Sequence, residues 1–363
     1  MRVLLISDHF GFGGVATVCN NLALGLQKKN INVELLSLLS DRESEVIAPE
    51  LPLHKFSFAR LQRLLIFPVV FRLVKFLQTH PYDIVISNKD HVNVYVILAK
   101  LLSKKPIVVI CNSHNTVSQI YQHTSRPIMK LVLNLGKFLY KKADVVANVS
   151  QGACCDSEQF FGLDKVHYLP NPVMVKSDQG ESDTVEFNGD LVNIVAIGRL
   201  GFQKNFQLML KSFAVAARYN QNLRLSILGE GTDKQNLIDL CNKLLISDKV
   251  NFCGTTKNVA SYLRKADFLW STSRFEGFGM VIVEALACGC PVLAVDCPFG
   301  PGEILQDGHG KLVHSFSVLP NALAVLSFSK ESKKPYSFYL DRAKQYDLDS
   351  CVTRYLTLFS ELK

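Results

Sequence analysis

Hydrophobic residues in this chain occur in short continuous runs, separated by longer stretches with helical spacing. The runs occupy positions 3–7, 32–37, 84–87, 107–111, 145–149, 193–197, 224–228, 250–254, 268–271 and the residues after Pro291. Helical spacing is clearest between the glycine loop at 11–14 and Leu26, at 206–219, at about 280–288 and from Ser350 to Leu362. Short apolar runs alternating with amphipathic helices are typical of parallel sheets covered by helices. The pattern therefore predicts an α/β protein.

The same pattern indicates two domains. A chain of 363 residues with 48% hydrophobic content can bury two cores and exceeds one typical domain. Residues 177–190 are polar, acidic and aperiodic, as an interdomain linker would be. We therefore predict one doubly wound, Rossmann-like domain at 1–172 and a second at 190–345.

Charge is unevenly distributed along the chain. Residues 51–150 contain 14 Lys and Arg but only three Asp and Glu, whereas the chain as a whole has a net charge of +8. Within this region, 55–80 and 125–142 combine apolar and basic residues without any acid. Such segments suit the surface of an anionic membrane. They are also consistent with core helices that have solvated basic backs, the first interrupted at Pro68. Nucleic-acid binding is not expected, because no recognition-helix or aromatic–basic strand motif occurs.

Other features of composition favour a cytosolic enzyme. The ten cysteines show neither disulfide-like pairing nor metal-ligand spacing, so we expect reduced thiols. The start of the chain resembles a strand and glycine loop rather than a signal peptide. No apolar run approaches the ~20 residues of a spanning helix. The expected location is the cytoplasm, with peripheral attachment to the inner face of the cytoplasmic membrane.

One candidate site lies between Ser271 and Val295. Glu284 stands alone in an apolar helix, and burying a carboxylate without donors costs several kcal/mol, so a partner such as a ribose diol is expected. Glu276 follows a strand, where open α/β sheets bind ligands, and Gly277 and Gly279 offer backbone N–H groups to an anion. For each glutamate alone a plainer interpretation stays open: Glu284 as a first-turn helix residue and Glu276 as a solvated loop charge.

Two basic residues complete this candidate site. Arg199 follows the strand at 193–197, and Lys204 directly precedes the helix at 206–219. A strand end and a helix start provide a diphosphate site in charge and position. In the first half, the strands at 84–87 and 107–111 are each followed by polar residues, and His114 comes after the second of them.

These motifs resemble the donor site of retaining glycosyltransferases of family 4, which have the GT-B fold. The resemblance rests on E-G-F-G-x-x-x-x-E-A-x-A-x-G-x-P-V from Glu276. It is supported by I-G-R-L with Lys204 and Asn205, L-G-E-G at 228–231 and D-C-P-F-G-P-G-E-I at 296–304. It covers most of the second half, and the first half only through a glycine loop and His114.

The resemblance implies two Rossmann-like domains that face a cleft, the first binding the acceptor and the second the nucleotide sugar. It also implies that the last helix, about 350–363, packs back on the first domain. Expected catalytic residues are His114, Arg199, Lys204 and Glu276. Donor contacts are expected from Gly13, Gly14, Arg199, Lys204, Phe252, Gly254, Phe278, Gly279 and Glu284.

The implied reaction transfers a hexose or N-acetylhexosamine from a UDP-sugar, with retention, to a glycan acceptor that is lipid-diphosphate-linked. Neither a cofactor nor a metal is expected, because Arg199 and Lys204 can neutralise the leaving diphosphate. The block at 296–304 resembles enzymes that extend bacterial surface glycans.

Alternatives stay open at this point. G-F-G-G-V-A at 11–16, with Glu34 about 20 residues on, also fits a dinucleotide-binding pattern, so an NAD-dependent oxidoreductase is one alternative. A UDP-sugar epimerase of the same fold and a non-catalytic carbohydrate-binding protein are others. Asp347 and Asp349 form the one Asp-x-Asp pair, which we interpret as capping of the last helix, with Asp349 as its N-cap, rather than as a metal site.

Overall fold

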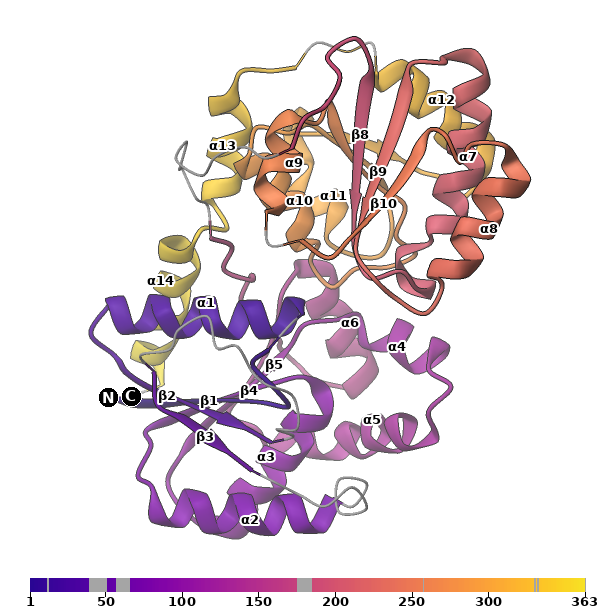
Figure 1. Ribbon diagram of the computed structural model, residues 1–363. Helices are drawn as coiled ribbons and strands as arrows, with labels where there is room; N and C mark the ends of the chain where they lie inside the picture. Colours follow the sequence, from indigo (N-terminus) through magenta and orange to yellow (C-terminus); the bar gives the residue numbers. More distant parts are fainter. Residues whose placement is uncertain are drawn as a thin grey trace. The chain divides into compact units, whose positions relative to one another are not determined.

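The computed structural model describes residues 1–11, 13–38, 51–56, 66–174, 185–256, 258–329, 331 and 333–362, arranged in two compact units (Figure 1). Unit 1 comprises Met1–Val173 and Leu348–Lys363, and unit 2 comprises Met174–Asp347. Residues 177–184 of the predicted linker at 177–190 lie outside the described residues.

Unit 1 contains a parallel sheet of seven described strands. Its order is β3-β2-β1-β4-β5-β6-β7. The strands are β1 (Arg2–Ser7), β2 (Asn32–Ser37), β3 (Leu53–Lys55), β4 (Ile84–Asn88), β5 (Val108–Ser113), β6 (Val145–Asn148) and β7 (His167–Tyr168). Alternate residues of β1 enter two different cores, because successive side chains point to opposite faces of a sheet.

Helices cover both faces of this sheet. They are α1 (Gly14–Lys28), α2 (Ile66–Thr79), α3 (Asp90–Ser103), α4 (Val117–His123), α5 (Pro127–Leu139), α6 (Gln151–Phe161) and α14 (Leu348–Glu361). The α2, α3 and α5 helices share one core, and α1 and α14 share the other (Figure 1). A Cβ at Gly25 of α1 would lie 2.4 Å from Cγ2 of Val352, so glycine permits the close approach of α14.

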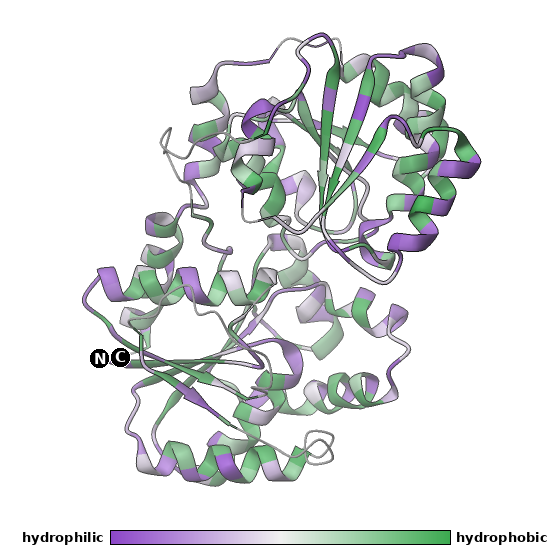
Figure 2. Cartoon of the chain, viewed as in Figure 1, coloured by the Kyte–Doolittle hydropathy of each residue, from purple (hydrophilic) through white to green (hydrophobic). Residues whose placement is uncertain are grey.

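Unit 2 repeats the architecture with six described strands in the order β10-β9-β8-β11-β12-β13, all parallel. They are β8 (Val192–Ile197), β9 (Leu223–Leu228), β10 (Val250–Gly254), β11 (Phe268–Ser271), β12 (Val292–Val295) and β13 (Lys311–Val313). The helices are α7 (Phe206–Tyr219), α8 (Lys234–Leu244), α9 (Val259–Lys265), α10 (Met280–Ala287), α11 (Pro301–Ile304), α12 (Val318–Phe328) and α13 (Tyr336–Lys344). Hydrophobic residues are concentrated in the strands, whereas the helices carry both kinds (Figure 2).

The strand orders give each sheet a topological switch point, where the direction of winding reverses. In unit 1 it lies between β1 and β4, and in unit 2 between β8 and β11. Open α/β sheets bind ligands outside the carboxyl ends of the strands at such points.

The predicted α/β class with two doubly wound halves is confirmed. Three predictions of detail are wrong. Pro68 does not interrupt its helix, because α2 continues through it from Ile66 to Thr79. The strand predicted at 107–111 runs from Val108 to Ser113, so His114 follows it directly. The last helix begins at Leu348, which places Asp349 in the first turn rather than at the cap. No helix in the described part of the chain is long and apolar enough to cross a bilayer.

Candidate functional site

Four of the predicted donor residues flank the switch point of unit 2. Arg199 and Lys204 follow β8, and Glu276 and Glu284 follow β11, the strand that pairs with β8. Residues more than 70 positions apart in the sequence therefore lie at the same edge of one sheet, where a single ligand could contact them.

Lys204 and Glu276 form an ion pair that the sequence did not predict. The Nζ of Lys204 lies 2.6 Å from Oε1 of Glu276, and the Ser273 hydroxyl donates to the same oxygen at 2.6 Å. The Glu276 N–H donates to the carbonyl of Pro298. The carboxylate is therefore held firmly, at 7% exposure, and it in turn orients the Lys204 ammonium.

The stem of Lys204 lies over Gly198. A Cβ at Gly198 would lie 2.9 Å from Cε of Lys204, so only glycine leaves room for this path. Two further glycines serve close packing of neighbouring loops. A Cβ at Gly229 would lie 2.0 Å from the carbonyl oxygen of Gly198, and one at Gly300 would lie 2.1 Å from that of Phe278. Part of the glycine pattern is thus explained by the packing of the loops that carry the site.

Glu284 and Arg199 have no hydrogen-bond or ion-pair partner among the residues that the structure describes. Burial raises the pKa of Glu284 in α10, and the Lys204 ammonium partly opposes that effect. Among the described residues, neither a donor to the Glu284 carboxylate nor an acceptor for the exposed Arg199 guanidinium is found. One carboxylate and one cation near the same strand ends are thus available to a ligand.

The remaining predicted donor residues differ in accessibility. Phe278 is 3% exposed and packs edge-on against Tyr346, so its side chain belongs to the core and only its backbone could reach a ligand. Phe252 is partly buried against the core of unit 2. Gly254 ends β10 with a φ of +69°, and Gly279 precedes α10 with a φ of +100°, conformations that favour glycine.

In unit 1, His114 is buried in a polar network at the ends of β4 and β5. Its Nε2 lies 2.9 Å from Oδ1 of Asn88, and its Nδ1 lies 3.0 Å from the side chain of Asn171. Burial lowers the pKa of His114 to about 4, so the imidazole is neutral at pH 7. Any role in chemistry is therefore that of a hydrogen-bonding group and not of a cation.

The glycines at the start of α1 face open space. A Cβ would meet no atom within 4 Å at either Gly13 or Gly14, and Gly13 has a φ of +122°. The backbone here is accessible to a ligand, and the expected donor contact of these glycines stays a prediction.

A charged cluster at the switch point of unit 1 was missed by the sequence analysis. Asp8 follows β1, and Lys89 follows β4, with Nζ 2.5 and 2.7 Å from the two carboxylate oxygens of Asp8. His91, in the first turn of α3, has Nε2 3.8 Å from Asp8. The sequence shows polar residues after the strands at 84–87 and 107–111. It does not show that β1 and β4 are neighbours, and it is this adjacency that brings Lys89 to Asp8.

Two family models match most of the chain. The model of "Glycosyltransferase Family 4" matches residues 12–176, and that of "Glycosyl transferases group 1" matches residues 179–339. The chain is a family 4 glycosyltransferase of the GT-B type. The donor motif around Glu276 lies inside the second match.

Several relatives resemble this glycosyltransferase over most of its length. The amylovoran biosynthesis glycosyltransferase AmsD of Erwinia amylovora is 26% identical over 309 residues, 84% of this chain and 83% of the relative. A Campylobacter jejuni enzyme, named as a 4-alpha-N-acetylgalactosaminyltransferase acting on a diphospho-undecaprenol substrate, is 29% identical over 257 residues, 69% and 68% of the two chains. The solved structure of Anabaena HepE with UDP-glucose matches the fold with a TM-score of 0.81 at 18% identity, over 99% of this chain and 100% of HepE.

The structure also bears on the oxidoreductase alternative. Glu34, which that alternative needs as a ribose acceptor, accepts hydrogen bonds from Arg2, His54 and Tyr82 near the start of β2. It lies away from the carboxyl ends of the strands, so the glycosyltransferase has no dinucleotide site of that kind at Glu34.

Metal ligation is not evident in the described part of the glycosyltransferase. There, no group of three or more His, Cys, Asp or Glu side chains is arranged to hold a metal ion. Asp349 of the Asp-x-Asp pair is exposed and lies 2.9 Å from Nζ of Lys29.

Proposed function

We propose that this glycosyltransferase transfers a hexose or N-acetylhexosamine from a UDP-sugar, with retention, to a lipid-diphosphate-linked glycan of a bacterial surface polymer. The observation that carries the proposal is the set of side chains at the unit 2 switch point. It combines a Lys204 held by Glu276 with Arg199 and Glu284, for which the described part of the chain supplies neither an acceptor nor a donor. A nucleotide sugar presents a diphosphate, sugar hydroxyls and a ribose diol, which are complementary to these groups.

Each residue then has a chemical role. Arg199 and Lys204 bind the diphosphate and stabilise the charge that develops on it as the glycosidic bond to UDP breaks. An ammonium has three donors, so Lys204 can contact a phosphate while it remains bound to Glu276. Glu276 binds sugar hydroxyls, and Glu284 binds the ribose. Gly279 and the start of α10 offer N–H groups to the phosphates.

Retention is proposed to occur by attack from the face of the leaving group. The best-placed carboxylate, Glu276, already accepts two hydrogen bonds on one oxygen, which makes it a poor nucleophile. The acceptor oxygen bonds to the anomeric carbon as the bond to UDP breaks, and its proton passes to the departing phosphate. His114 contributes by hydrogen bonding beside the transferred sugar, and Gly13 and Gly14 allow close approach of ligand to backbone.

The donor and acceptor classes are supported by the relatives. HepE was solved with UDP-glucose, and the Campylobacter jejuni enzyme is named for a diphospho-undecaprenol acceptor. A lipid-linked acceptor and a cytosolic nucleotide sugar meet at the inner face of the cytoplasmic membrane, where we place this enzyme.

Unit 1 is proposed to bind the anionic membrane through α2 and α5, which contain no acidic residue and lie in the layer with α3 (Figure 1). Their inner residues are core, as the plainer interpretation expected. Their outer surface nevertheless exposes Phe67 (85%), Phe71 (74%) and Phe138 (76%). Exposed aromatic residues among Lys and Arg are typical of an interfacial helix. We call Phe67, Phe71, Arg72, Lys75, Lys130, Lys137 and Phe138 the basic–aromatic surface.

The test separates the two glutamates by calorimetry with UDP and with a UDP-sugar. Glu284→Gln should weaken both ligands by about tenfold or more, since each contains the ribose and a hydrogen bond to a charged group contributes about 1.5–3 kcal/mol. Glu276→Gln should remove the additional affinity of the sugar and weaken UDP much less than Glu284→Gln does, because the amide oxygen of Gln can still accept from Lys204. Glu331→Gln, at a half-exposed carboxylate paired with Lys311, is the control. Equal effects of both changes on UDP would contradict the assigned roles.

A further inference from the structure

The charged cluster at the unit 1 switch point is not used by the donor chemistry. It is formed by Asp8, Lys89 and His91, whose side chains are between 15% and 21% exposed. These side chains are therefore accessible to a ligand. Asp8 also accepts from the Ser7 hydroxyl at 3.2 Å and from the backbone N–H of His9 at 2.9 Å, both at Oδ1.

Hydrogen-bonding capacity remains on this pair. A carboxylate has about four acceptor sites and an ammonium three donors. Among the described residues, Oδ2 of Asp8 accepts from Lys89 alone, and the His91 and His9 imidazoles lie 3.8 Å from the carboxylate. Oδ2 of Asp8 can thus accept one more hydrogen bond, and Nζ of Lys89, which lies 2.7 Å from it, can donate one more. Two neighbouring hydroxyls of a sugar, one accepting and one donating, are complementary to this arrangement.

The charges of the cluster discriminate between ligands. Asp8 and Lys89 cancel each other, and burial lowers the pKa of His91, so the imidazole adds no charge at pH 7. An anion such as a diphosphate would gain no net attraction here. A neutral polyol would gain two charge-assisted hydrogen bonds.

The backbone of Lys89 supports a role beyond packing. Its φ of 83° and ψ of 140° are unfavourable for any residue except glycine. The backbone N–H donates to the Asn112 carbonyl and the carbonyl accepts from Asn93, so this conformation is held from both sides. A lysine at a position better suited to glycine indicates that its side chain has a use.

We propose that Asp8 and Lys89 form the subsite that recognises the neutral sugar of the acceptor, and that the acceptor's diphosphate binds elsewhere. This inference rests on the proposed function and specifies its acceptor end. Asp8 accepts from one hydroxyl, Lys89 donates to its neighbour, and His91 lies beside the pair.

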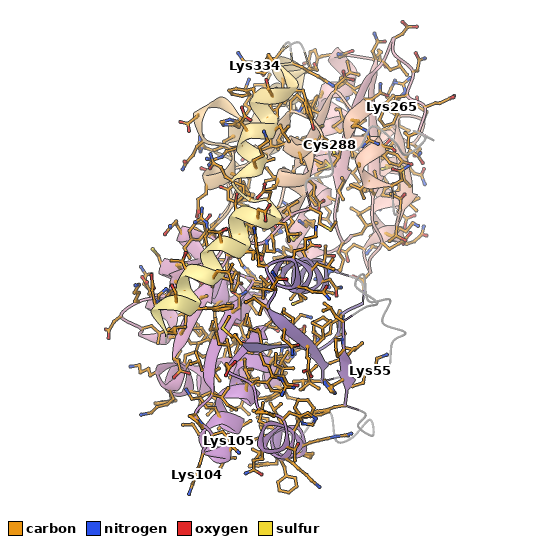
Figure 3. The ribbon with its side chains drawn as sticks, turned by 90° about the vertical axis from the view of Figure 1, so that its left-hand side faces the viewer. Lys55, Lys104, Lys105, Lys265, Cys288 and Lys334 are labelled. Carbon is orange, nitrogen blue, oxygen red and sulfur yellow. The ribbon has the colours of Figure 1, made fainter. Side chains whose placement is uncertain are left out.

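The test uses saturation-transfer NMR with four methyl α-glycosides, of glucose, galactose, N-acetylglucosamine and N-acetylgalactosamine, on the UDP-saturated enzyme. At least one should bind the wild type, and Asp8→Asn and Lys89→Gly should weaken it by tenfold or more. Lys89→Gly relieves the backbone but leaves Asp8 without its partner cation, so its melting temperature is measured alongside the wild type to establish that the variant is folded. The control is Lys104→Gly, since Lys104 has a φ of 54° at the far end of the same helix and lies at the periphery of unit 1 (Figure 3).

Three results would overturn the proposal. The first two are no binding of any glycoside to the wild type and unchanged glycoside binding in both variants. The third uses geranyl diphosphate as a soluble probe for a lipid-linked diphosphate, and is loss of its binding in Lys89→Gly with glycoside binding intact. UDP titrations of the same proteins keep the two proposals distinct, because a wild type that binds no UDP contradicts the donor site and not this subsite.

Discussion

At the scale of single residues, the structure shows how neighbours change the chemistry of a side chain. Lys204 and Glu276 were each predicted as independent ligand groups, but they lie 2.6 Å apart and act as a unit. His114 was predicted as catalytic, and its burial keeps it neutral. Both effects depend on residues distant in the chain.

Lys204→Ala should lower turnover by tens of fold or more. The substitution removes a charge-assisted hydrogen bond that strengthens as charge builds on the leaving diphosphate. The proposed role of Lys204 and Arg199 in neutralising the diphosphate requires no metal, so wild-type transfer is expected to persist in EDTA. Steady-state assays of UDP release would measure both. Lys234→Ala, which breaks the exposed pair with Glu230, should behave like the wild type. Activity lost in EDTA and restored by manganese would refute this site.

The buried His114 should make stability depend on pH. Its pKa is about 4 in the folded protein and about 6.5 when exposed, so between these values the unfolded chain binds more protons. The contribution is fully present above about pH 6.5 and falls by up to about 1.4 kcal/mol per pH unit as pH drops toward 4. Urea unfolding at pH 7, 6 and 5 should show a shallower dependence in His114→Gln than in the wild type or in the exposed-site variant His123→Gln. Parallel curves would show that His114 does not titrate in this way.

At the scale of elements, each sheet assembles its candidate site at the switch point. Asp8 and Lys89 follow β1 and β4, and Arg199 and Glu276 follow β8 and β11. Turns after the strands of both sheets contain glycines of two kinds. Those at Gly229 and Gly300 are required by neighbouring backbone, whereas Gly13 and Gly14 face open space.

Gly14→Ala should separate fold from function. Alanine at the first residue of α1 would meet no atom within 4 Å and favours a helix, so the melting temperature should be maintained or raised. If a ligand approaches this backbone, kcat/KM should fall tenfold or more. Gly25→Ala on the same helix is the matched comparison, because its Cβ would collide with Val352 and destabilise the fold. A Gly14→Ala enzyme with normal kinetics would restrict this glycine to a structural role.

At the scale of the whole molecule, charge is segregated along the chain. Residues 51–150, which contain 14 basic and three acidic residues, lie within unit 1. The remainder of the chain is slightly acidic. Arg60 and Arg63, which the sequence analysis included in the first basic segment, lie outside the described residues. Arg72 and Lys75 of α2 are described and exposed.

The basic–aromatic surface should give weak, salt-sensitive membrane binding. Each basic residue near an anionic bilayer contributes about 1 kcal/mol. Arg72→Gln with Lys75→Gln, and separately Phe67→Ser with Phe71→Ser, should reduce sedimentation with anionic vesicles and slow transfer to a lipid-linked acceptor. Transfer to a short soluble acceptor should stay near normal. Lys211→Gln with Lys243→Gln removes the same charge from unit 2 and should have little effect. Failure of the wild type to sediment at low salt would exclude this surface as a membrane site.

The sequence by itself determined the α/β alternation, the bounds of α7, β10 and β11, and the donor motif that identifies the family. These features are encoded locally, in periodicity and spacing. Tertiary structure decided which charged groups meet: Lys204 with Glu276 across 72 positions, and Lys89 with Asp8 across 81. It also decided that Glu34 is paired. The packing of α14 with unit 1 follows from no local pattern and was expected only from the family resemblance. The physical reason is that strand order determines which strand ends become neighbours, and no local pattern records strand order.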